Sequence, residues 1–259
     1  MTFPNRIERF RAVDSTQRVV REWLEGGTDE VAIAVADYQT AGQGRQGRDW
    51  MAPPGAGLLL SVGFKPEVLA PRHGWRLAAI VSLAMRDAAE EQAGLQDGTI
   101  WLKWPNDLVS DAQDGGLHKV GGVVGESVTG STGVKSAVIG IGINSNWAAV
   151  NFPWALSRSM NSLRELAGKR PIDNEALLEG FLARLEPRYE ALKQGTFDAA
   201  GWSAAQRTTG RRVTVELGDE TVSGTATGVD PESGALVFRG EDGAEVRVDS
   251  GAVIRCRVR

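Results

Sequence analysis

Apolar residues recur at two different spacings along the first two thirds of the chain, and each spacing predicts one kind of element. Helical spacing predicts helices over residues 17–24, 74–92 and 161–205. The first of these helices follows Asp14-Ser15-Thr16, a sequence that is typical of a helix N-cap. Continuous apolar runs predict buried strands over residues 31–36, 58–64, 99–103, 120–126 and 134–143.

The order of these elements indicates how they are arranged. Residues 120–126 and 134–143 are the longest apolar runs close together in the sequence, so we expect them to pair in the centre of a sheet. Helices and strands mix around one sheet instead of alternating strictly. The pattern therefore predicts an α+β fold.

The pattern changes near residue 211. Short alternating segments follow one another to the end of the chain, separated by Gly, Asp and Pro turns. Such a series is typical of a small closed β-barrel. We therefore expect a boundary near residue 209, with one domain over residues 1–209 and a second over residues 210–259.

Composition and charge narrow the class of protein. Hydrophobic residues make up 42% and charged residues 24% of the 259 residues, as in ordinary globular domains. The net charge of −4 argues against nonspecific binding of nucleic acid. One cysteine, no leader pattern and no apolar run of about 20 residues indicate a cytoplasmic protein without a membrane span.

A glycine-rich loop over residues 40–56 contains Gly42-Gln43-Gly44-Arg45-Gln46-Gly47, which matches the dinucleotide fingerprint G-x-G-x-x-G. That fingerprint must open a helix, whereas here two prolines follow at once. We therefore reject the interpretation of this loop as a dinucleotide-binding motif. Convergent N–H groups and the charges of Arg45 and Arg48 could still hold phosphate. A solvated loop with two surface arginines remains the alternative, although such long loops are usually functional or disordered.

Polar residues interrupt the apolar pattern at three further places. The turn 103–107 contains Lys103, Asn106 and Asp107, for which a structural Lys103–Asp107 ion pair is the alternative explanation. Residues 119–122 set Lys119 beside Gly121 and Gly122, and glycines in a strand allow a ligand to approach the backbone.

The third place is Asn144, which ends a strand with the glycine-spaced sequence of residues 140–143. An asparagine at a strand end can also be only a turn former. Taken together, two lysines, two arginines and an aspartate indicate a site for an anionic, phosphate-bearing ligand. Two histidines and one cysteine cannot build a structural zinc cluster, and no G-x-S-x-G nucleophile motif occurs.

These motifs together resemble one family. The runs DST at 14–16, YQTAGQGRQGRDW at 38–50, KWPNDL at 103–108, KVGG at 119–122 and GIGIN at 140–144 resemble, in order and spacing, those of the biotin–protein ligases. The resemblance implies a class II synthetase-like catalytic domain with a mixed sheet, followed by a small SH3-like β-barrel. Because the chain before Asp14 is short, we expect the ligase-only type, without an N-terminal DNA-binding domain.

The resemblance also implies roles for individual residues. The implied catalytic residues are Lys119, Arg45 and Asp107. The implied biotin-binding residues are Ser15, Thr16, Gln17, Gln39, Gly42, Gln43, Gly44, Arg45, Lys119 and Gly122. The implied ATP and adenylate-binding residues are Arg45, Arg48, Trp50, Lys103, Asn106, Asp107, Lys119, Asn144 and Arg257, with Arg255 as the alternative to Arg257. Gln43 and Gln46 stand where family members often carry arginine.

The implied reaction joins biotin to ATP as biotinyl-5′-AMP and passes biotin to a lysine of a biotin carboxyl carrier domain of acyl-CoA or pyruvate carboxylases. Magnesium is expected on the ATP phosphates, with Asp107 as a candidate ligand. A lipoate–protein ligase and a noncatalytic biotin-binding module are the alternative functions. The sequence leaves open a monomer or a weak homodimer.

Overall fold

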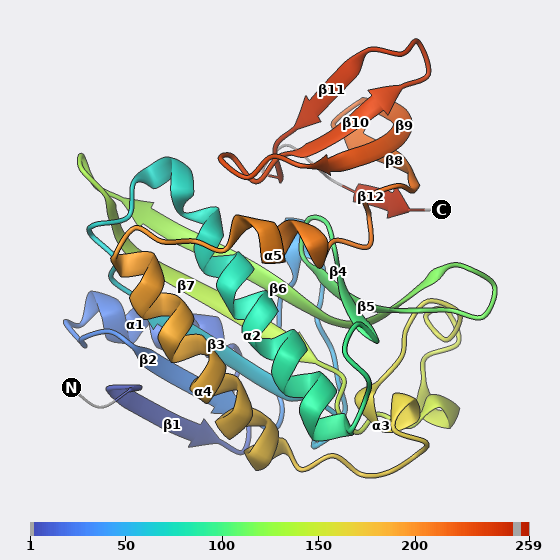
Figure 1. Cartoon of the computed structure of the whole chain (residues 1–259). Coiled ribbons are helices and arrows are strands. Elements are labelled where there is room, and N and C mark those ends of the chain that lie inside the picture. Colours follow the sequence, from blue (N-terminus) through green and yellow to red (C-terminus); the bar gives the residue numbers. More distant parts are fainter. Residues whose placement is uncertain (1–2, 251–254, 259) are drawn as a thin grey trace.

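The computed structural model describes residues 3–250 and 255–258, which form two β-sheets and the helices that cover the larger one (Figure 1). The larger sheet contains β1 (Arg6–Phe10), β2 (Ala32–Ala36), β3 (Leu58–Phe64), β4 (Ile100–Lys103), β5 (Asp107–Asp111), β6 (Leu117–Thr129) and β7 (Val134–Ile143). Its strand order is β1-β2-β3-β7-β6-β5-β4. Only the β1–β2 pair is parallel, so the predicted mixed sheet is confirmed.

Helices cover both faces of this sheet. They are α1 (Thr16–Glu25), α2 (Trp75–Ala93), α3 (Leu163–Leu166), α4 (Asn174–Lys193) and α5 (Ala199–Ala204). Figure 1 shows α2 and α4 side by side on one face. Helix α1 lies against the other face, where Val20 and Leu24 pack on Ala34 and Val138. No helix within the described ranges combines the length and apolarity that a bilayer crossing requires.

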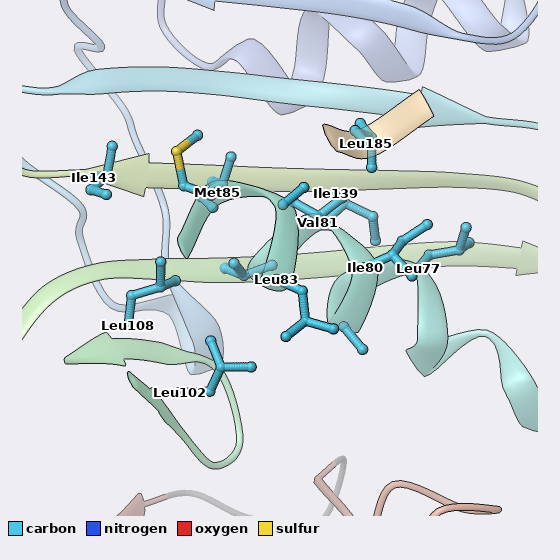
Figure 2. Packing of buried hydrophobic residues seen from close by; sticks show 14 of the residues in the cluster. Leu77, Ile80, Val81, Leu83, Met85, Leu102, Leu108, Ile139, Ile143 and Leu185 are labelled. Carbon is cyan, nitrogen blue, oxygen red and sulfur yellow. The ribbon is translucent and has the colours of Figure 1, made fainter. Parts of the chain in front are cut away.

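The main core lies under α2 and α4. Leu77, Ile80 and Met85 of α2 point toward Ile139 and Ile143 of β7 (Figure 2). Each buried aliphatic side chain of this kind contributes roughly 1.5–3 kcal/mol by leaving water. This core stabilises the sheet from the side of α2 and α4. Part of the opposite face, near the start of α1, lines a cavity.

The second sheet contains β8 (Arg212–Leu217), β9 (Glu220–Val229), β10 (Leu236–Gly240), β11 (Glu245–Val248) and β12 (Arg255–Val258). Every pairing is antiparallel, in the order β11-β10-β9-β8-β12. This confirms a small antiparallel β structure after the mixed sheet. Among the described residues, β11 and β12 are its two edge strands. We propose that the domain boundary lies near residue 209, between α5 and β8.

The two sheets are held together by specific contacts. The indole nitrogen of Trp104 donates to the carbonyl oxygen of Gly234 at 3.0 Å. Arg211, which directly precedes β8, pairs with Asp111 of β5 at 3.1 Å. The second sheet therefore rests next to the β4–β5 hairpin, as Figure 1 shows.

Three parts of the chain differ from the sequence prediction. The helical stretch expected over residues 161–205 is divided into α3, α4 and α5, with non-helical segments between them. Strand β1 was not expected, because three of the five residues of its sequence RIERF are charged and the strand lies at the sheet edge. The polar sequence of residues 110–116 indicates an exposed loop, yet β5 continues to Asp111 and Ser110 is buried. A short polar strand resembles a loop in sequence, because its burial comes from neighbouring strands.

Candidate active site

A cavity of about 840 Å³, here called the ligand cavity, opens between the α1 face of the larger sheet, the glycine loop (residues 42–50) and β12. Its wall contains every predicted site residue except Gly42: Ser15, Thr16, Gln17, Gln39, Gln43, Gly44, Arg45, Arg48, Trp50, Lys103, Asn106, Asp107, Lys119, Gly122, Asn144 and Arg257. Segments distant in sequence thus meet around one space.

Gly42 instead allows two backbone segments of the loop to approach each other closely. A Cβ at this position would lie 2.6 Å from the carbonyl oxygen of Trp50. The Trp50 N–H donates to the Gly42 carbonyl at 2.8 Å, and an isolated antiparallel bridge joins Gln43 to Asp49. Gly42 therefore closes the base of the glycine loop.

The glycine loop forms a narrow hairpin with one 3-10 turn (Arg45–Gly47), and no α-helix begins there. Gln46 and Gly47 both have positive φ angles, of 56° and 67°. This geometry confirms that the loop is not a dinucleotide-binding fingerprint, because that motif must lead into a helix. The guanidinium of Arg45 donates to the carbonyl oxygen of Ser250, so the loop also contacts the C-terminal part of the chain.

Asp107 lies between two lysines. Its carboxylate is 2.7 Å from the Lys119 ammonium and 3.2 Å from that of Lys103. Burial alone would raise the pKa of this carboxyl, but the two lysines outweigh burial and hold the pKa below its usual value. The ion pair considered as an alternative for Lys103 is thus present, and it lies within the cavity wall.

A second polar cluster lies near the start of α1. The Gln39 side-chain oxygen accepts from the Thr16 backbone N–H at 2.7 Å and from its hydroxyl at 2.9 Å. The Thr16 hydroxyl also lies 2.8 Å from that of Ser61. Ser15 occupies the N-cap position, yet its side chain makes no capping hydrogen bond. The Ser15 hydroxyl faces the cavity instead.

Ser61 is a site residue that we did not predict. It is fully buried, lines the cavity and is the only polar residue of β3. A single hydroxyl in a continuous apolar strand was the available signal, because a buried polar group needs a partner.

Glycines shape the cavity floor. A Cβ at Gly142 would lie 2.5 Å from the indole ring of Trp50, and one at Gly122 would lie 3.0 Å from the Lys119 nitrogen. The Lys119 ammonium is also 5.1 Å from the centre of the Trp50 ring, within cation–π range. These glycines therefore let an aromatic ring and a cation lie flat against the sheet.

The two predicted asparagines support loops around the cavity. Asn106 donates to the carbonyl oxygen of Val123 at 2.9 Å, and Asn144 donates to that of Asn161 at 3.0 Å. Their amide groups hold the rim of the cavity as well as lining it.

Strand β12 completes the wall with Cys256, Arg257 and Val258. Arg257 reaches the cavity and is paired with Glu216 at 2.8 Å. The side chain of Arg255, the alternative to Arg257, lies outside the described residues. The wall therefore includes residues of both sheets.

Cys256 provides a test of this wall. Burial raises the pKa of its thiol to about 11, so we expect alkylation at pH 8 to be about 100-fold slower than for a thiol of pKa 9. Alkylation is followed by mass spectrometry, and the same chain in urea is the control. Equal rates in the folded and unfolded chain would show that β12 does not shield this thiol. Cys256 is the only cysteine in the sequence, so the readout needs no variant.

Known proteins share both the sequence and this architecture. Residues 9–144 match the model of the biotin/lipoate A/B protein ligase family, and residues 208–255 match that of the biotin protein ligase C terminal domain. A biotin–acetyl-CoA-carboxylase ligase of Mycobacterium tuberculosis is 31% identical over 90% of this chain and 82% of its own. The bifunctional ligase/repressor BirA of Bacillus subtilis is 30% identical over 89% of this chain and 68% of its own.

Solved structures agree with these sequence matches. The biotin protein ligase of Aquifex aeolicus, solved in complex with biotin and ATP, superposes with a TM-score of 0.80. Its sequence is 26% identical, and the match covers 98% of this chain and all of that one.

Proposed function

The chain belongs to the biotin/lipoate A/B protein ligase family, and from this premise we propose that it activates biotin with ATP and attaches biotin to a lysine of a carrier protein. The main support is the ligand cavity, which is lined by the cations Lys119, Lys103 and Arg45. The strands beside them contribute Gly122, Gly140 and Gly142. A volume of about 840 Å³ is large enough for two reactants bound together.

The first step must bring two anions together, the carboxylate of biotin and the α-phosphate of ATP. Fixed cations in a site that excludes water stabilise such a meeting more strongly than cations in water do. Lys119 lines the ligand cavity and forms an ion pair with Asp107 at 2.7 Å. We assign to Lys119 the binding of both reacting groups.

The biotin end of the cavity is the polar cluster near α1. Ser15, Thr16 and Gln39 offer hydroxyl and amide groups that suit a ureido ring, which both donates and accepts hydrogen bonds. The hydroxyl of Ser61 forms a hydrogen bond with that of Thr16 at 2.8 Å. The remaining members of this proposed biotin site are Gln17, Gln43, Gly44 and Gly122.

The nucleotide would lie toward Arg48, Trp50, Lys103 and Asn144, with Arg257 closing the far side. Magnesium would enter on the ATP phosphates, because this ion keeps most of its water and takes one or two carboxylates from a protein. Asp107 is partly buried in the wall, and each of its oxygens contacts a lysine. It would be the carboxylate that holds the ion.

Transfer requires a neutral lysine amine on the carrier protein. Asp107 is a partly buried carboxylate 2.7 Å from Lys119, and we assign to it the orientation and deprotonation of the carrier amine. The acceptor that we propose is the biotin carboxyl carrier domain of a carboxylase. A cytoplasmic location is part of the same proposal, because such carriers meet ATP there.

The glycine loop is expected to close over the adenylate, since a mixed anhydride must be kept from water. We predict that trypsin cleaves after Arg45 or Arg48 in the empty protein, and that biotin with ATP slows this cleavage about tenfold by lowering the open population. The products are identified by mass spectrometry, and ATP alone is the control. Equal cleavage with and without both ligands would contradict closure.

One experiment tests the proposed function directly. The protein is mixed with ATP, magnesium, biotin and a biotin carboxyl carrier domain, and the carrier is weighed by mass spectrometry. We expect the mass of one biotinyl group to be added to the carrier lysine. Lipoate in place of biotin is the specificity control, and equal use of lipoate would contradict the assigned substrate.

A further inference from the structure

A second cavity, of about 220 Å³, lies on the α2 side of the larger sheet. Ala79 and Ser82 of α2 line it, whereas Thr16 and Gln17 of α1 line the ligand cavity. Because α1 and α2 cover opposite faces of the sheet, the two cavities lie on opposite faces.

The two cavities meet at the turn between β4 and β5. Six residues line both of them: Arg45, Lys103, Pro105, Asn106, Asp107 and Val123. Strand β5 pairs with β6 as far as Asp107 opposite Gly122, and the turn residue Asn106 adds two hydrogen bonds to Val123, at 2.8 and 2.9 Å. The two cavities therefore meet around the turn at the end of the β4–β5 hairpin.

The second cavity contains a buried acceptor without a donor. Gln206 is 6% exposed, and no donor among the described residues reaches its side-chain oxygen. Burying such an oxygen unpaired costs stability, so its position favours a ligand that carries an N–H or O–H group.

Aromatic side chains form much of the remaining wall. Trp75, Trp104 and Trp202 line the cavity beside Gln206. The indole N–H groups of Trp75 and Trp104 already donate to backbone oxygens of Glu232 and Gly234, at 3.3 and 3.0 Å. These rings therefore offer apolar surface to a ligand.

The lining selects one class of ligand. Apolar walls suit a chain of methylene groups, the Gln206 oxygen suits an N–H donor, and aromatic faces also attract an amine that still carries its charge. The carboxylate of Asp107 lies at the inner end. A primary alkylamine, the side chain of lysine, combines all of these properties.

We propose that the second cavity is the channel through which the acceptor lysine of the carrier protein reaches the adenylate. This inference rests on the proposed function. The outer end of the channel is formed by Gly74 and by the exposed Gly125 and Ser127. The amine thus arrives from the α2 face while the adenylate occupies the α1 face, and the two meet beside Asp107.

The inner end also suits the chemistry of transfer. Lys103 and Arg45 are positive there, and nearby positive charge favours the neutral form of an incoming amine. The amine nitrogen forms a bond to the acyl carbon, the bond from that carbon to the phosphate oxygen breaks, and AMP leaves with the electron pair. The proton lost by the nitrogen passes to Asp107 and then to water.

Filling the channel tests the proposal. Ala78 is partly buried and lines only the second cavity, so Ala78→Phe should block the channel without touching the ligand cavity. We expect pyrophosphate release during adenylate formation to stay within about twofold of wild type, and transfer to a carrier domain to fall about 10²-fold. Hydroxylamine is a small nucleophile that needs no channel. The rate at which it attacks the adenylate should therefore be unchanged.

The matched control is Gln92→Phe on the same helix, which lies outside both cavities and should transfer normally. Thermal melting checks that each variant folds. A second pair tests the acceptor oxygen: Gln206→Leu should raise KM for the carrier about tenfold, whereas Gln206→Glu keeps an oxygen there and should rescue part of this loss.

The outcomes separate the two proposals. Normal transfer by both Ala78→Phe and Gln206→Leu would overturn the channel. Slow pyrophosphate release with normal transfer would also overturn it and would assign the cavity to the leaving pyrophosphate. A wild-type protein that makes no biotinyl-AMP would instead overturn the proposed function itself.

Discussion

Lys119→Ala should lower the rate of adenylate formation by about 10²–10³-fold, the usual effect of removing one preorganised donor from a charge-stabilising site. The ammonium of Lys119 is only partly exposed and is fixed by Asp107 at 2.7 Å. It needs little rearrangement to meet a carboxylate and a phosphate. The rate is measured as biotin-dependent release of pyrophosphate in a single turnover.

Two variants control this experiment. Lys135→Ala removes an exposed lysine of β7 that does not line the ligand cavity, and it should leave the rate unchanged. Lys119→Arg keeps the charge but changes its shape, so it should recover part of the activity. Wild-type adenylation by Lys119→Ala would refute the role assigned to this lysine.

Asp107→Asn should slow the transfer of biotin from preformed adenylate to the carrier by about 10²–10⁴-fold, the usual contribution of a general base. The amide keeps the shape of the side chain but cannot take a proton. Transfer is measured by adding a carrier domain to the isolated protein–adenylate complex. Impaired adenylation with intact transfer would contradict this assignment.

Asp49→Asn is the matched control, because Asp49 also lines the ligand cavity but is exposed. The pKa of Asp107 is held low, so its contribution to stability is present above its unfolded pKa of about 3.9 and is lost as pH falls below that value. We therefore expect Asp107→Asn to be less stable than wild type at neutral pH. This difference should shrink in acid.

The regular elements could be predicted because their signals are local. Strand β3 was predicted with its observed bounds, 58–64, since its run of apolar residues is uninterrupted. Strand β1 could not be, because Arg6–Phe10 has a polar pattern and becomes a strand only by pairing with β2. A short edge strand that forms by pairing with a distant segment has only a weak signal in its own sequence.

The wall of the ligand cavity could be predicted through the motifs of the family, but its internal contacts could not. The approach of Asp107 to Lys119 depends on the register between β5 and β6, in which Asp107 is opposite Gly122. One residue of slip would turn these side chains to the other face. The sequence alone does not fix that register.

The second cavity had no signal in the sequence. Its wall combines α2, α5, β6 and β7 with Gly234 and Ser250 of the C-terminal part. Gln206 follows α5, directly after the segment 161–205 that was expected to be helical. Its unusual environment becomes visible only once these distant parts are packed together.

The wall of the ligand cavity joins Ser15 to Arg257, nearly the whole length of the chain. During synthesis on the ribosome, Lys119 and the glycine loop emerge long before β12, so a nascent chain would hold the main cations without a finished wall. Biotin and ATP would then meet a finished wall only in molecules in which β12 has been made and folded. Their binding should raise the denaturant midpoint of both sheets together, because ligands stabilise only the state that binds them.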